Sequence, residues 1–113
     1  RFEDGERYGR RLIEKGATAI FACNDMMAYG VLKAASSMGL SVPEDVSVIG
    51  FDNIPFSELT NPPLTTMNQH AIRIGEMAME KLIRLIRSDS EPQEGVRLTP
   101  ELVVRRSVKR KVE

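Results

Sequence analysis

Two short apolar runs, at residues 17–23 and 46–51, limit what this chain can fold into. Both runs are nearly free of polar side chains, which is typical of strands that are buried on both faces in a parallel sheet. Between them, residues 26–38 repeat apolar side chains at the spacing of a helix. Because strands that alternate with helices form parallel sheets with right-handed crossovers, the pattern predicts an α/β fold.

The remaining segments extend this pattern and then break it. Helical spacing within residues 5–15 predicts a first helix, and Gly16 is suited to end it. The prolines of residues 53–63 predict a loop. After this loop we expect an extended stretch at 64–67, a long helix at 69–87, a linker at 88–95, short strands at 96–98 and 102–104, and a basic tail at 105–111.

Composition excludes several classes of protein. The 113 residues include 16 basic and 16 acidic side chains and are only 5% aromatic, so the chain is neither a strongly basic nucleic-acid module nor a base-stacking platform. One Cys and one His provide neither an intrachain disulfide nor a His/Cys zinc site. No apolar run could span a bilayer, and no glycine-rich phosphate loop is present. We therefore expect no metal, no cofactor and no membrane partner, and the lone cysteine fits a cytoplasmic protein.

A pair of Asn and Asp residues follows each apolar run: Asn24-Asp25 and Asp52-Asn53. The carboxyl ends of parallel strands meet at one edge of the sheet, where open α/β folds bind their ligands. An amide that donates and accepts, beside a carboxylate that accepts, suits a ligand rich in hydroxyls, such as a sugar. The same residue types also cap helices and form turns, so a purely structural role stays open for each pair.

No catalytic constellation accompanies these pairs. His70 lies at the start of a helix without a Ser or Cys motif, and Cys23 ends a buried strand as a small core side chain would. Asp25 and Asp52 could form an acid/base pair in a sugar-active enzyme, but no motif supports it. We interpret the basic residues 105–111 as a solvated tail, because no aromatic side chain or recognition helix accompanies them. The sequence thus favours a binding protein over an enzyme.

Several short motifs occur together in a fixed order. They are NDMMAYG at 24–30, GL at 39–40, VPEDVS at 42–47, GFD at 50–52, PLTT at 63–66 and RRS at 105–107. In this order and spacing, they resemble the lactose/galactose-repressor (LacI/GalR) family of bacterial transcription regulators. The resemblance covers about residues 5–107.

The resemblance implies a fold like that of type I periplasmic sugar-binding proteins, with two α/β lobes and a ligand cleft between them. The sequence matches the later half of the carboxyl-terminal lobe, a crossing strand and one helix of the other lobe. By this match, residues 1–66 belong to the carboxyl-terminal lobe, residues 67–99 hold the crossing strand and the helix of the other lobe, and residues 100–113 form the returning strand and basic tail. The helix-turn-helix head of the family has no match in this sequence.

The resemblance also implies which residues bind. Asn24 and Asp52 match positions that hydrogen-bond effector hydroxyls, and Gln69 matches a position at the edge of the cleft that reaches the ligand in some members. Phe2 would stack on the effector ring. Asp25 would support these residues and cap the following helix. Four residues lie where members of the family pair as homodimers: Met27, Val31, Ala34 and Phe56.

The function implied by the resemblance is the sensing of a small effector, most plausibly a sugar, with allosteric control of operator DNA through the separate head. The alternative is a sugar-binding protein that feeds a transporter and shares the fold, although the VPEDVS and LTT motifs favour the regulator. Because much of the two-lobe fold has no match here, we expect an exposed apolar stripe on the 69–87 helix and association with a second copy of the chain.

Overall fold

The two apolar runs form the parallel strand pair that the sequence predicts. The computed structural model describes residues 1–87 and 94–112. Strand β1 (Ala19–Phe21) runs parallel to β2 (Ser47–Ile49), and helix α2 (Asp25–Ser37) connects them. Helix α1 (Phe2–Glu14) precedes them and begins three residues before its predicted start. Acidic side chains in its first turn favour this earlier start, because they interact well with the positive end of the helix dipole.

The second half of the chain adds one strand beside β2 and then leaves the sheet. It comprises the short 3-10 helix η1 (Pro55–Glu58), β3 (Thr66–Asn68), α3 (Ala71–Ile86) and β4 (Glu101–Val103). Parallel bridges join Ile49 to Thr65 and Asp52 to Asn68, so β3 continues the parallel arrangement past the end of β2. β4 then pairs with β3 in the antiparallel direction. The predicted linker at 88–95 lies mostly outside the described residues.

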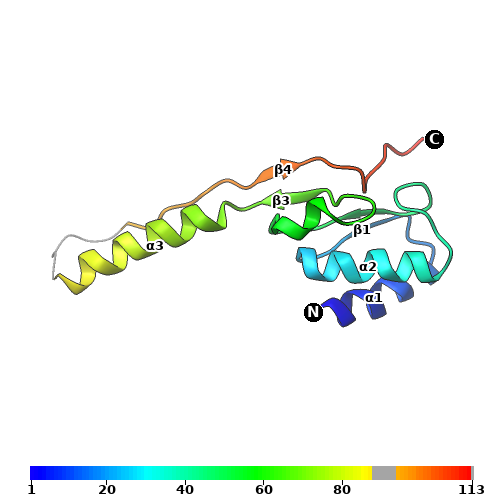
Figure 1. Ribbon diagram of the computed structural model, residues 1–113, viewed down its shortest axis with the longest axis horizontal. Helices are drawn as coiled ribbons and strands as arrows, with labels where there is room; N and C mark the ends of the chain where they lie inside the picture. Colours follow the sequence, from blue (N-terminus) through cyan, green and yellow to red (C-terminus); the bar gives the residue numbers. More distant parts are fainter. Residues whose placement is uncertain (88–93, 113) are drawn as a thin grey trace.

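One core lies between the strands and α2, and α1 covers the other side of α2 (Figure 1). Its buried residues are Ile20, Ala22, Ala28, Tyr29, Val31, Leu32, Ala35, Val46, Val48 and Leu64. Residues of β1 alternate between exposed and buried, and Phe21 is exposed. The prediction that β1 is buried on both faces is therefore wrong, because no helix of the described residues covers its second face.

The contact between α1 and α2 is unusually close and corrects part of the predicted dimer surface. A Cβ on Gly30 would lie only 2.1 Å from the carbonyl oxygen of Phe2, so the two backbones touch where Gly30 has no side chain. Val31 lies against α1, and both Val31 and Ala34 are buried. Neither residue offers an open surface to a second copy in this structure, because α1 packs on their helix. Phe56 is 56% exposed and stays a candidate.

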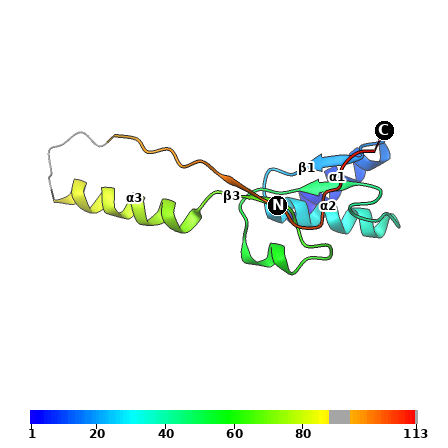
Figure 2. The ribbon, with the colours of Figure 1, turned by 90° about the horizontal axis from the view of Figure 1, so that it is seen from above.

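Helix α3 projects away from this core, and the described residues before β4 run beside it, as Figures 1 and 2 both show. None of its residues is buried, and Ile72 is 81% exposed. The predicted apolar stripe therefore lies open along the helix. The molecule is correspondingly long, with extents of 59 × 28 × 24 Å.

The predicted strand at residues 96–98 does not form. Val96 and Leu98 instead run back beside α3 and line a groove of about 310 Å³ with Ile74, Met77 and Lys81. The apolar pattern of this segment is suited to a strand, but no described strand lies beside it to complete the hydrogen bonds. The neighbouring prediction at 102–104 is confirmed as β4, because β3 supplies its partner.

Candidate ligand-binding site

The ends of β2 and β3 meet in one small region. The backbone N–H of Asp52 donates to the carbonyl of Met67 at 3.0 Å, and Asp52 bridges to Asn68. On the other side of β2, the N–H of Asp25 donates to the carbonyl of Phe51 at 2.8 Å. Both Asn and Asp pairs therefore lie at the carboxyl edge of the strands, as the sequence predicts.

A groove of about 680 Å³ opens between the end of β2 and the start of α3. The β2 side contributes Asp52, Asn53, Ile54 and Pro55. The opposite side consists of residues at the β3–α3 junction and in the first turns of α3: Asn68, Gln69, His70, Ala71, Ile72, Arg73 and Glu76. The groove thus combines amides, carboxylates and one guanidinium with a few apolar side chains, a composition suited to a small polar ligand.

Asp52 and Gln69, both predicted from the sequence as binding residues, are in direct contact. The Gln69 Nε2 donates to Asp52 Oδ1 at 2.7 Å. Burial, and after it the negative charge of Asp25, raises the pKa of the Asp52 carboxyl. A carboxylate that is poorly solvated gains more from additional hydrogen-bond donors than one in free solution. Asp52 is therefore suited to accept hydroxyl groups of a ligand in the groove.

The backbone at this turn is strained. Asp52 has φ 128° and Asn53 has φ 58°, and neither is glycine. Such conformations persist only where the surrounding structure holds them, and they gather at functional sites. His70, at the opposite edge of the groove, also has positive φ, and its N–H donates to Asn68 Oδ1 at 2.9 Å.

Asn24 takes the capping role that the sequence assigns to Asp25. Its Oδ1 accepts the N–H of Met27 at 2.9 Å, so Asn24 is the N-cap of α2 and Asp25 is the first helical residue. The correction follows from backbone geometry, since Asn24 is still extended while Asp25 has turned into the helix. With its oxygen occupied, the amide nitrogen is the part of Asn24 that is suited to donate to a ligand.

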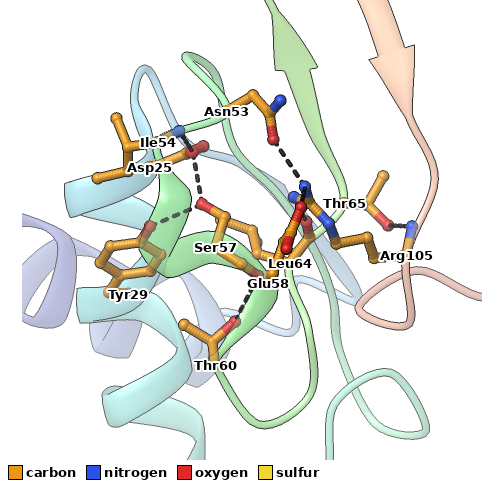
Figure 3. A network of polar contacts seen from close by, with 10 residues as sticks. All are labelled: Asp25, Tyr29, Asn53, Ile54, Ser57, Glu58, Thr60, Leu64, Thr65 and Arg105. Carbon is orange, nitrogen blue, oxygen red and sulfur yellow. Dashed lines mark hydrogen bonds and ion pairs between the residues drawn. The ribbon is translucent and has the colours of Figure 1, made fainter.

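Asp25 is fully buried and joins α2 to the loop at residues 54–57, as Figure 3 shows, and to β3. Its Oδ2 accepts the Ser57 hydroxyl at 2.6 Å and the Ile54 N–H at 3.0 Å. Its Oδ1 accepts the Thr66 hydroxyl at 2.5 Å. A Cβ on Gly50 would lie 2.3 Å from this Oδ1, so the carboxylate fits only beside glycine. Asp25 thereby fixes the loop and β3 against α2, and its support of the ligand-binding residues stays a prediction.

Tyr29 extends this network. Its hydroxyl lies 2.6 Å from the Ser57 Oγ, and burial is the main reason why the pKa of Tyr29 is raised. A hydroxyl that stays protonated can donate to Ser57, which in turn donates to Asp25. The charge on Asp25 is therefore stabilised by a chain of hydroxyl groups and one backbone N–H, with no cation among its contacts in the described residues.

The segment predicted to be a solvated tail is partly buried. Ser107 is fully buried, and its hydroxyl donates to the carbonyl of Val48 at 2.6 Å. Arg105 donates to the carbonyl of Leu64 at 2.9 Å and to Asn53 Oδ1 at 2.7 Å (Figure 3). The sequence did not predict these contacts, because composition cannot show which basic side chain of the run at 105–111 contacts residues that are distant in the sequence.

Phe2 does not reach the groove. It lies at the start of α1, packs against the core, and has the Lys33 ammonium 5.6 Å from its ring centre. Asn53, singled out in the sequence together with Asp52, lines the groove, whereas sequence reasoning missed Asn68, Arg73 and Glu76. Arg73 and Glu76 lie one turn apart on α3, and this helical spacing is the signal that could have placed them on the same face.

The described residues contain no cluster of three or more His, Cys, Asp or Glu side chains positioned to hold a metal ion. Within the described part of the chain, no helix combines the length and apolar character needed to cross a membrane.

Comparison with known proteins agrees with this architecture. Residues 2–108 match the periplasmic binding protein-like domain family. The HTH-type transcriptional repressor PurR of Haemophilus influenzae is 46% identical over 112 residues, which cover 95% of this chain and 33% of that protein. The chain thus spans about a third of the length of the curated relatives it matches.

Solved structures share the same fold. The LacI family transcriptional regulator of Enterococcus faecium with bound ribose superposes with a TM-score of 0.90 at 33% identity, covering 95% of this chain and 40% of that one. The lac repressor dimer bound to operator and an anti-inducer gives 0.82 at 30% identity, covering 94% and 37%. This chain therefore belongs to the periplasmic-binding-protein-like family, in the form found in LacI-family transcription regulators.

Proposed function

We propose that this chain is the ligand-sensing part of a bacterial transcription regulator. The observation that carries the proposal is the Asp52–Gln69 pair on a groove of about 680 Å³, at the point where the chain passes from β3 into α3. In this proposal, residues 1–66 and 100–113 belong to one lobe, and residues 67–99 hold the crossing strand and a helix of a second lobe. The effector binds between the lobes.

We propose a sugar as the effector. Asp52 accepts hydroxyl protons, and Gln69 both donates and accepts. Asn24 lies outside the residues that line the groove, so it would reach only a ligand that extends beyond them. The ribose bound to the regulator of Enterococcus faecium supports this class of ligand. Binding would change how the lobes close and thereby alter the operator affinity of a separate DNA-binding head, which is allostery between two sites.

We further propose that the regulator acts in the cytoplasm as a homodimer. Phe56 is exposed beside Tyr29, with the ring centres 5.5 Å apart, and gives the dimer an aromatic contact. The lac repressor, a structural relative, is a dimer on its operator. Size-exclusion chromatography with light scattering tests this part, and a stable monomer at all concentrations would contradict it.

The test of the main proposal uses the full-length natural protein that contains this sequence. Calorimetry with ribose, galactose and lactose measures binding, and fluorescence anisotropy on promoter DNA measures whether the same sugar changes DNA affinity. Nucleobases form the contrast set, because amides and carboxylates also hydrogen-bond their edges. We expect one sugar to bind and to shift DNA affinity. Binding of nucleobases alone would contradict the sugar assignment, and sugar binding without any DNA binding would favour the transporter alternative.

A further inference from the structure

Arg105 differs from the basic residues around it. Its side chain is only 12% exposed, whereas that of Lys109 is 44% exposed and forms an ion pair with Glu44 on the surface. Withdrawing a guanidinium from water is unfavourable unless its N–H groups find acceptors. The contacts of Arg105 therefore indicate what its burial stabilises.

One of these contacts reaches Asn53, which lines the groove. Arg105 Nη2 donates to Asn53 Oδ1 at 2.7 Å, and Nη1 donates to the carbonyl of Leu64 at 2.9 Å. Its backbone N–H donates to the hydroxyl of Thr65 at 2.9 Å. The ion pair with Glu58 is longer, at 3.4 Å, and Glu58 is 72% exposed, so that contact adds little.

The strained backbone of Asn53 is the feature that a hydrogen bond from Arg105 can stabilise. It has φ 58°, and it follows Asp52, which has φ 128°. Asp52 itself is held by its N–H bond to Met67 and by Gln69. The Asn53 side chain is held by the charged guanidinium of Arg105, whose planar fork also fixes the direction of the bond.

We propose that Arg105 is a positioning residue for the ligand-binding turn. By holding Asn53 in its left-handed conformation, it fixes the direction in which Asp52 presents its carboxylate to the groove. The contact also joins the turn to the segment after β4, where Ser107 is anchored to β2. The proposal rests on the proposed function only in naming Asp52 as a ligand-binding residue.

Hydrogen exchange measured by mass spectrometry tests this role in the full-length natural protein without any ligand. The informative peptides span residues 51–55, which contain the turn, and residues 46–49, which contain the Val48 N–H that donates to the carbonyl of Ser107. In Arg105→Met we expect exchange at 51–55 to accelerate about tenfold, the factor equivalent to about 1.4 kcal/mol. Exchange at 46–49 should change less than about twofold, because the Val48 contact does not involve the Arg105 side chain.

Two further variants separate positioning from general support. Asn53→Ala removes the acceptor of the Arg105–Asn53 hydrogen bond and should also accelerate exchange at 51–55. This variant keeps the test available if Arg105→Met does not fold. Glu58→Gln removes the weak partner of Arg105 and should leave both peptides unchanged. Equal acceleration of both peptides in Arg105→Met would show that Arg105 merely holds the last segment in place, and no acceleration at 51–55 would also overturn the proposal.

A ligand measurement in the same variants keeps the two proposals apart. If ribose or another sugar binds the natural protein, Arg105→Met should weaken its binding about tenfold, while Glu58→Gln should not. Accelerated exchange at 51–55 in a protein that binds no sugar would support the positioning role and reject the sugar. Normal exchange together with sugar binding would reject the positioning role alone.

Discussion

Asp25 and Asp52 are two carboxylates at the same edge of the strands, yet their surroundings differ. Asp25 is fully buried, and three donors from the loop and β3 satisfy it. Asp52 is half-buried on a strained turn, and Gln69 is its one side-chain partner among the described contacts. The hydrogen bonds of Asp25 stabilise the fold, while Asp52 has a carboxylate oxygen that can still accept a hydrogen bond from a ligand. The number of hydrogen-bond donors that each carboxylate already has, rather than its residue type, distinguishes the structural carboxylate from the one that we propose binds the ligand.

The largest expected effect comes from removing the structural carboxylate. Asp25→Ala should lower the free energy of unfolding by about 4 kcal/mol, because three buried donors lose a charged acceptor. Urea denaturation of the full-length natural protein measures this. Asp25→Asn serves as the matched control and should lose less, since one amide oxygen still accepts. A loss below about 1 kcal/mol for Asp25→Ala would mean that the network does not hold these segments together.

Removing the second carboxylate should affect binding rather than folding. Asp52→Ala should weaken sugar binding about 100-fold, equivalent to about 2.7 kcal/mol, because hydrogen bonds to an ionised group are lost. Calorimetry measures the affinity, and Glu14→Gln, an exposed carboxylate on α1, controls for the change in charge. Equal affinity in Asp52→Ala and the parent protein would remove Asp52 from the site.

A smaller change tests how far the structural network extends. Tyr29→Phe removes the hydroxyl that lies against Ser57 but keeps the ring beside Phe56. We expect the free energy of unfolding to fall by about 1 kcal/mol, the contribution of one neutral hydrogen bond. Sugar affinity should stay the same, because Tyr29 does not line the groove. A large loss of affinity would show that the two carboxylate regions are coupled.

The smallest effect concerns the pH dependence of stability. Folding raises the pKa of Asp52, so the folded state binds its proton more tightly than the unfolded state. The associated stabilisation is present below the unfolded pKa and is lost as the pH rises through the folded pKa. Asp52→Asn should therefore be slightly more stable than the parent at neutral pH, and this difference should vanish once the carboxyl is protonated. Urea denaturation curves of both proteins, from neutral pH down to a pH at which the carboxyl is protonated, measure this difference. A lower stability of Asp52→Asn at neutral pH would contradict the expectation.

Local patterns predicted much of this fold. The apolar runs gave β1 and β2, helical spacing gave all three long helices, and the two Asn and Asp pairs marked the strand edge that carries the groove. The open apolar surface of α3 also followed from its sequence, and none of its residues is buried. Asp52 and Gln69, each predicted separately as a binding residue, lie in direct contact, while their role in binding stays a prediction.

Local sequence patterns could not predict contacts between residues that are far apart in the sequence. Ser57 and Thr66 reach Asp25 across 32 and 41 positions, and Arg105 reaches Asn53 across 52. Nothing local indicates that these side chains meet. Phe2 was predicted to contact the ligand and Val31 to lie on a dimer surface, and both predictions failed for the same reason. The sequence predicted helix α1 but not that it packs on α2, where it covers Val31 and places Phe2 against the core.

A crystal structure of the full-length natural protein with a bound sugar tests the central claim most directly. The account predicts that sugar hydroxyls lie within about 3 Å of the Asp52 carboxylate and the Gln69 amide, in the groove between β2 and α3. Asp25 should keep its contacts with Ser57 and Thr66 and should not touch the sugar. A sugar bound elsewhere, with Asp52 still paired only to Gln69, would contradict the account.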